Sequence, residues 1–200
     1  MEIDTRAAAA QLGLSQRQVQ RLAEGGRVAG RRIAGRTVVS TRSLIALSRS
    51  TARGRRWNAA TVSAACELLE RGTTTHILGS QRSRLRARLA AIPISDLAYQ
   101  VLADRVTLWR RAQRGAGSAQ DSREGLSSSG ARLEVIVTPD ANAVARKERL
   151  LDDADGDTLI VQFDTASPSV IEDIALFAYG DERTSSAARQ RIEVRRTALS

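Results

Sequence analysis

Residues 5–47 read TRAAAAQLGLSQRQVQRLAEGGRVAGRRIAGRTVVSTRSLIAL, and this stretch decides the fold of the N-terminal part of the chain. Thr5 is a suitable N-cap for a first helix, and Gly13 marks the turn that ends it. Ser15 is a suitable N-cap for a second helix, which the glycine pair at 25–26 terminates. The spacing therefore predicts two short helices joined by a tight turn.

The residues that follow predict a β-hairpin and a further helix. Apolar positions alternate around Gly30 and Gly35, which is typical of two antiparallel strands joined by a turn, here called a wing. The segment STRSLIALS at 40–48 has helical spacing and predicts a closing helix.

The second predicted helix is apolar at Val19 and Leu22, so its Gln and Arg side chains face outward. Gln pairs with adenine and Arg with guanine in the major groove, while arginines of the wing suit phosphates or the minor groove. A solvated helix face is the simpler alternative. The candidate DNA-binding residues are Ser15, Gln16, Arg17, Gln18, Gln20, Arg21, Arg27, Arg31, Arg32 and Arg36.

The order of these features resembles the excisionase and MerR-like winged helix-turn-helix family over about residues 4–47. The match runs from T-x-x-x-A-A through L-G-x-S and V-x-R-L-x-x-x-G to the glycine-punctuated basic hairpin. The resemblance implies that Ser15 to Glu24 is a recognition helix and Arg31 to Val39 the wing. Gln20-Arg21 stand where the family often has an aromatic residue, so the operator sequence is not implied.

The sequence predicts an α+β protein, mostly α with small β, in three regions. They are a winged helix-turn-helix domain at 1–56, a wholly helical region at 57–114 and, after a Gly/Ser-rich linker at 115–130, an acidic α/β region at 131–200. The expected helices are 57–71, 80–89, 95–114, 139–151, 170–178 and 185–196, and the expected strands are 133–138 and 158–164.

Charge is segregated along the chain, whose net charge is +9. Residues 1–56 hold 12 Arg and 3 acids, residues 57–114 hold 9 Arg and 4 acids, and residues 115–200 hold 10 basic and 15 acidic residues. A coding bias explains the preference for Arg over Lys but not this segregation. We expect double-stranded DNA to bind the basic front and a protein partner to bind the acidic remainder.

The sequence offers no catalytic or metal-ligand set, so we expect neither enzyme activity nor a cofactor or metal. Cys66, the single cysteine, lies on an apolar helical face, and His76 is the single histidine. Acidic pairs such as Asp152/Asp153 and Glu172/Asp173 are expected to be solvated charge. No membrane-length apolar run and no signal peptide occur, so we expect a cytoplasmic protein without membrane contact.

The rest of the chain resembles actinobacterial antitoxins that pair with nucleotidyltransferase-type toxins of the AbiE kind. The match is carried by the segment at 56–89, by LWRRA at 108–112, and by LEVIVTP, TLIVQFD and IALFAYGDERTSSAARQRI in the C-terminal region. Asp181, Arg183, Ser186, Ala187 and Ala188 carry the last part of it. The resemblance implies that the front represses its own operon and the remainder neutralises a cognate toxin, with Asp181 and Arg183 as partner-binding residues.

Two alternatives stay open. One is an ordinary transcriptional regulator whose C-terminal part binds an effector or dimerises, and the other is an excisionase-type recombination factor. A single helix-turn-helix makes few base contacts, so a homodimer or tandem binding to repeated sites is expected.

Overall fold

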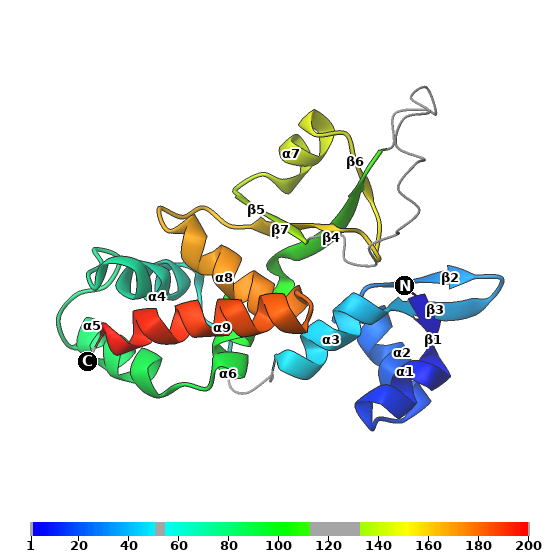
Figure 1. The fold of residues 1–200 in the computed structure, drawn as a ribbon, viewed down its shortest axis with the longest axis horizontal. Coiled ribbons are helices and arrows are strands. Elements are labelled where there is room, and N and C mark those ends of the chain that lie inside the picture. The colour runs from blue at the N-terminus through cyan, green and yellow to red at the C-terminus, as the bar shows by residue number, and fades with distance from the viewer. Residues whose placement is uncertain (1, 51–54, 113–132, 200) are drawn as a thin grey trace.

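The computed structural model describes residues 2–50, 55–112 and 133–199, which combine helices with two small sheets (Figure 1). Nine α-helices occur in these ranges, and the predicted α+β class is confirmed. The linker predicted at 115–130 lies outside the described residues. Within them, no helix is both long enough and apolar enough to cross a lipid bilayer.

Residues 2–50, here called the N-terminal unit, fold into three helices and a three-stranded antiparallel sheet of order β1-β3-β2. Asp4 rather than Thr5 caps the first helix, because its Oδ1 accepts a hydrogen bond from the Ala7 amide at 2.7 Å. Thr5 begins the helix and is buried. The elements are β1 (Glu2–Asp4), α1 (Thr5–Leu12), α2 (Gln16–Glu24), β2 (Gly30–Ile33), β3 (Arg36–Ser40) and α3 (Thr41–Arg49).

The other described residues, here called the C-terminal body, surround a four-stranded sheet of order β5-β7-β4-β6. Strand β5 is parallel to β7, whereas β4 is antiparallel to both of its neighbours. The elements are α4 (Ala59–Arg71), α5 (Gly79–Ala91), α6 (Ile94–Leu102), the 3-10 turn η1 (Ala103–Arg105), β4 (Val106–Arg111), β5 (Glu134–Thr138), α7 (Ala141–Lys147), β6 (Leu150–Asp152), β7 (Thr158–Gln162), α8 (Pro168–Tyr179) and α9 (Glu182–Thr197).

Two expected helices were predicted too long. The helix expected at 95–114 ends at Leu102, and the wholly helical region is therefore wrong because residues 106–111 form β4. Leu108 is buried while its neighbour Thr107 is exposed, an alternation that suits a strand. The helix expected at 139–151 is also wrong at its end: Arg149 has a positive φ of 54°, and β6 follows.

The sheet of the body has helices on both faces. Leu159 and Val161 of β7 belong to the large core built with α4, α6, α8 and α9, whereas Ile160 between them packs with α7. Alternate residues of a strand point to opposite faces, which explains this division. The same large core contains residues from both 57–114 and 131–200, so the two predicted regions share one interior.

Asp173 is a buried charge that the sequence did not reveal. Expected as solvated, it is only 6% exposed within α8, and α9 covers it. Its carboxylate accepts hydrogen bonds from Arg191 at 2.6 Å and from Arg195 at 3.4 Å. The prediction was wrong because two arginines from a later helix supply the pairing that burial of a carboxylate requires.

The N-terminal unit joins the body through α3, which lies beside α8 (Figure 1). Arg49 at the end of α3 donates to the carbonyl of Gly180 at 2.6 Å and to Glu182 at 2.9 Å. It also reaches the carbonyl of Phe177 at 3.4 Å. These carbonyls lie at the C-terminal end of α8, where a cation is favourable.

Candidate nucleic-acid interface

Helix α2 has a sharply defined start. Ser15 Oγ accepts a hydrogen bond from the Gln18 amide at 3.3 Å, and the Gln18 side chain accepts one from the Ser15 amide at 2.8 Å. This reciprocal capping box fixes the first turn, and it confirms the predicted N-cap at Ser15. The helix ends as predicted at the glycine pair, with Gly25 as C-cap and Gly26 at a φ of 67°. Ser15 and Gln18 are thereby engaged in holding the helix.

The outer face of α2 carries the side chains that remain available to a partner. Val19 is fully buried on the opposite face. Gln16 donates to Thr5 Oγ1 at 3.0 Å, which ties the start of α2 to the start of α1. Arg17 and Arg21 are exposed and Gln20 is half-buried. Within the described ranges, no ion pair or hydrogen bond engages these last three side chains.

The hairpin of β2 and β3 is an exposed basic arm. Ala34 and Gly35 both have positive φ, at 47° and 79°, as a two-residue hairpin turn requires. The strands pair from Gly30 opposite Val39 to Ile33 opposite Arg36. All four residues of β2 are exposed, and Arg36 is exposed beside them. Arg32 and Arg36 therefore point from the arm into solvent.

Arg31 of the same arm differs from its neighbours because it already has an acidic partner. Its guanidinium contacts both carboxylate oxygens of Glu2 at 3.0–3.1 Å. This hydrogen bonding and the nearby charge of Glu2, with a smaller contribution from Asp153, raise the pKa of Arg31. Arg31 is thus partly neutralised before any phosphate approaches.

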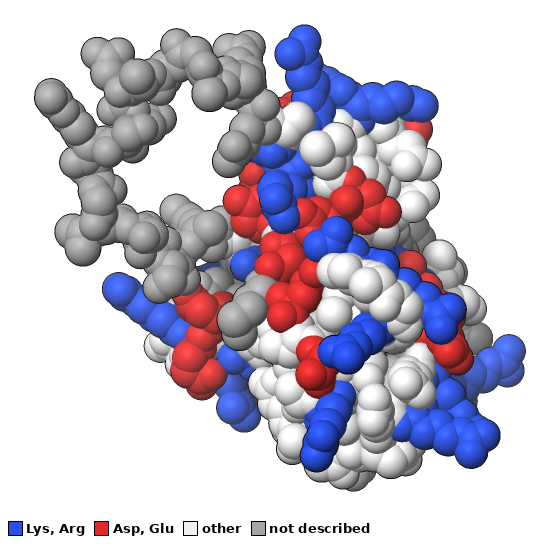
Figure 2. All heavy atoms as spheres, turned by 90° about the vertical axis from the view of Figure 1, so that its right-hand side faces the viewer, with Lys and Arg blue, Asp and Glu red and all other residues white. Residues whose placement is uncertain are grey.

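Acidic side chains gather at the middle of the face that bears the hairpin (Figure 2). The segment from β6 to β7 carries three aspartates, with Asp152 at the end of β6 and Asp153 and Asp155 in the turn that follows. Asp153 forms an ion pair with Arg110 of β4. These aspartates would repel the phosphates of a nucleic acid bound at the hairpin. Such a nucleic acid would therefore approach more favourably from the side of α2.

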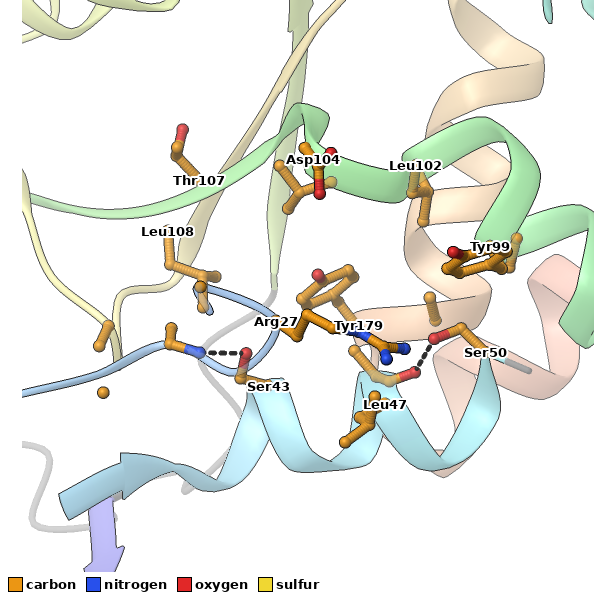
Figure 3. A pocket seen from close by; sticks show the side chains of 18 of the residues that line it. Arg27, Ser43, Leu47, Ser50, Tyr99, Leu102, Asp104, Thr107, Leu108 and Tyr179 are labelled. Atoms are coloured by element: carbon orange, nitrogen blue, oxygen red, sulfur yellow. Dashed lines mark hydrogen bonds between the residues drawn. The ribbon is translucent and has the colours of Figure 1, made fainter. Parts of the chain in front are cut away.

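Arg27 is set apart from the other candidate DNA contacts. It lies between α2 and β2, and its side chain projects into a cavity between the N-terminal unit and the C-terminal body (Figure 3). That placement separates it from Arg17 and Arg21 on the outer face of α2.

The two candidate partner-binding residues have different environments. Asp181 caps α9, and its Oδ1 accepts a hydrogen bond from the Thr184 amide at 2.7 Å. This bond, with that from the Thr184 hydroxyl, holds the pKa of Asp181 below its ordinary value. Arg183 is exposed in the first turn of the same helix. Asp181 is therefore first of all a helix cap, which the D-x-x-T spacing signals.

The single cysteine and histidine do not form a reactive centre in the described part of the chain. Cys66 is fully buried in α4, and burial raises the pKa of its thiol to about 12. His76 lies on the surface with Nε2 at 3.3 Å from Glu67. Among the described residues, no cluster of three or more His, Cys, Asp or Glu side chains is arranged to hold a metal.

Sequence reasoning missed the residues that surround Arg27. Tyr99, Asp104 and Tyr179 line the same cavity from α6, η1 and α8. They are dispersed over eighty positions, so no local pattern could have joined them.

Comparisons of the chain with protein-family models, with curated proteins and with solved structures found no match.

Proposed function

We propose that the N-terminal unit is a winged helix-turn-helix that binds double-stranded DNA. In this reading α2 enters the major groove and the β2–β3 hairpin is the wing. The observation that carries the proposal is the outer face of α2, where Arg17, Gln20 and Arg21 have no partner among the described residues and belong to the same unit as the basic arm. A helix that buries one face and exposes arginines on the other, as α2 does, can present those arginines to base edges.

Roles follow from the partners that each side chain already has. Arg17, Gln20 and Arg21 are assigned to bases and adjacent phosphates, since Arg suits guanine and Gln suits adenine. Arg32 and Arg36 are assigned to the phosphate backbone. Ser15, Gln16 and Gln18 act by fixing the helix, because their side chains bond within the unit.

The test uses the full chain and a duplex of about 30 base pairs selected from a random pool by the full chain itself. The double variant Arg17→Ala/Arg21→Ala is expected to weaken binding about 100-fold in fluorescence anisotropy, since one arginine contact contributes about 1–3 kcal/mol. The control Arg146→Ala/Lys147→Ala removes the same charge from exposed positions of α7. Equal affinity of the two double variants would contradict the proposal.

The biological role proposed for this DNA binding is that of an antitoxin that represses its own operon, with the acidic remainder holding a basic nucleotidyltransferase-type toxin. The support is the resemblance described above and the excess of acids in residues 115–200. A homodimer on repeated half-sites would supply the additional base contacts.

The two roles can be separated in one experiment. The full chain is co-expressed with the reading frame beside its own gene, with growth and a promoter reporter as readouts. Arg17→Ala/Arg21→Ala is expected to restore growth as the wild type does and to lose repression. A folded variant that loses both would contradict the division of roles, and a neighbouring frame that causes no growth arrest would contradict the antitoxin role.

A further inference from the structure

A cavity of about 460 Å³ lies where the N-terminal unit meets the C-terminal body (Figure 3). One side is formed by the connection from α2 to β2 and by α3, and the other by α6, η1, β4 and α8. Its size lies within the range of about 300–1,000 Å³ that small-molecule sites have. The cavity thus lies at the junction between the N-terminal unit, which is proposed to bind DNA, and the C-terminal body.

The walls combine apolar surface with a few polar groups. Leu47 of α3, Leu102 of α6 and Leu108 of β4 supply apolar surface, with Ala98 and Ala178 between the polar groups. Small-molecule sites have this composition, in which apolar contacts provide affinity and sparse polar groups fix orientation.

Tyr179 is the first polar group in the cavity. Its side chain is half-buried, and burial raises its pKa to about 12, so the hydroxyl keeps its proton. No hydrogen bond joins this hydroxyl to any described residue, so it is available to a ligand in the cavity that it lines. Figure 3 shows the ring between α8 and the Arg27 side chain. Tyr179 therefore presents an unused donor inside the cavity.

Arg27 supplies a positive charge to the same space. Within the described residues it has no ion pair or hydrogen bond, whereas Arg56 at the rim is held by Asp104 and donates to Tyr99 Oη at 3.3 Å. Asp104 is thereby engaged by Arg56, and the Tyr99 hydroxyl, which accepts from Arg56, can still donate a hydrogen bond of its own. The remaining acid, Asp152, is exposed and comes from the β6–β7 side of the cavity.

We propose that this cavity binds a small organic anion. The apolar part of the ligand packs against the leucines of α3, α6 and β4. Its carboxylate, sulfonate or phosphate group accepts hydrogen bonds from Arg27, Tyr99 and Tyr179. Uncommitted donors outnumber uncommitted acceptors at this end of the cavity, which favours an anion over a cation or a neutral amine.

The site deepens the proposed function, because a ligand here regulates DNA binding if the N-terminal unit is the reading head. Gly25, Gly26, Arg27 and Gly30 all line the cavity and connect α2 to the hairpin. A ligand that holds Arg27 restricts this connection and so changes how α2 and the hairpin present themselves to one duplex. The ligand shifts the equilibrium between arrangements of α2 and the hairpin only if it binds one arrangement more tightly than another.

Binding is tested on the full chain with two probes of similar shape. 1-Anilinonaphthalene-8-sulfonate carries an anionic group, and N-phenyl-1-naphthylamine is its neutral counterpart. We expect saturable fluorescence from one sulfonate probe per chain. Arg27→Gln is expected to weaken that probe about tenfold and the neutral probe less than twofold, since a charged hydrogen bond is lost only for the first.

The matched control is Arg189→Gln, which removes an exposed arginine of α9 away from the cavity. Tyr179→Phe, which deletes only the hydroxyl, is expected to weaken the sulfonate probe about threefold. Leu47→Trp fills the cavity and should abolish binding of both probes. Circular dichroism and the urea midpoint confirm that each variant is folded. Equal sulfonate affinity in Arg27→Gln and Arg189→Gln, or equal weakening of both probes by Arg27→Gln, would overturn the anion site.

A last measurement separates this site from the proposed function. The selected duplex is titrated with and without saturating sulfonate probe, and a change in affinity of at least about threefold is expected. Probe binding with no change in DNA affinity would overturn the regulatory link alone. A chain that binds the probe as expected but selects no duplex would overturn the proposed function and leave the anion site in place.

Discussion

The N-terminal unit and the C-terminal body differ in how much apolar side chain they bury. The unit has a core of six fully or nearly fully buried apolar residues, namely Ala8, Ala9, Val19, Val28, Val39 and Leu44. The body buries Leu and Ile from five helices and three strands together with both phenylalanines. A unit of this size leaves little interior. It therefore depends on its contact with the body for part of its stability.

The two parts also differ in how they treat charge. Arg17, Arg21 and Arg32 of the unit point into solvent, without an acidic partner among the described residues. In the body, Asp173 is buried and held by Arg191 and Arg195. Paired charge stabilises an interior, whereas exposed unpaired charge is available to an external partner. The comparison indicates a stable C-terminal body joined to an N-terminal unit with exposed basic side chains.

The largest expected effect tests whether the body holds most of the stability. Ile171→Ala removes a fully buried side chain of α8 and should lower the free energy of unfolding by about 3 kcal/mol, through lost burial and the cavity left behind. Leu44→Ala is the matching deletion in the unit, where Leu44 is 1% exposed. It should expose α1–α3 to hydrogen exchange and leave α4 and α8 protected.

Cys66 reports on the same contrast. Its thiol is buried in α4 with a pKa of about 12, so a thiol reagent reaches it only when the large core opens. Labelling should be faster in Ile171→Ala and unchanged in Leu44→Ala. The exposed control Val194→Ala should change stability by less than about 0.5 kcal/mol. Equal labelling rates in both core variants would mean that the two parts unfold together.

The next prediction concerns the contact between the N-terminal unit and the C-terminal body. Arg49→Ala removes the hydrogen bonds to Gly180, Phe177 and Glu182 and should cost about 2 kcal/mol, because buried carbonyls lose a charged donor. Hydrogen exchange should rise in α1–α3. Arg42→Ala on the same helix is the control, and no ion pair of Arg42 occurs within the described residues. If both variants behave alike, α3 is held by apolar contact alone.

A smaller effect is confined to the N-terminal unit. Ser15→Ala removes the N-cap of α2 and should lower stability by about 1 kcal/mol. DNA affinity should fall as well, because the first turn of α2 frays while its arginines remain. Thermal unfolding and anisotropy measure the two effects. Ser186→Ala, an exposed position of α9, is the control, and an unchanged DNA affinity in Ser15→Ala would show that the capping box does not position the proposed contacts.

The smallest effect concerns pH at the cap of α9. The pKa of Asp181 is lowered by the hydrogen bonds from Thr184, so the charged form stabilises the folded chain. That stabilisation is present above the ordinary pKa of 3.8 and is lost as pH falls through the lowered value. Asp181→Asn keeps a capping side chain without the charge. The stability difference between variant and wild type should vanish in acid, and a constant difference across the titration would contradict the assignment.

Local features of the candidate interface were predictable from the sequence. The cap at Ser15, the end of α2 at Gly25 and the hairpin turn at Gly35 are found where the pattern predicts them. Strand β4 and the early end of α7 were not. The residues of β4 also suit a helix by spacing, and the outcome depends on pairing with β7, about fifty residues later in the chain.

The sequence by itself determined which segments begin and end as helices near the N-terminus, which faces are basic, and that the chain is mixed α and β. Those properties depend on contacts within about four residues and on composition. Only the tertiary structure decided that Asp173 is buried, that Arg49 joins the N-terminal unit to the C-terminal body, and that Arg27 and Tyr179 share a cavity. Each of these requires groups distant in sequence to meet, so position in the fold rather than residue type sets the energy of a charge or hydroxyl.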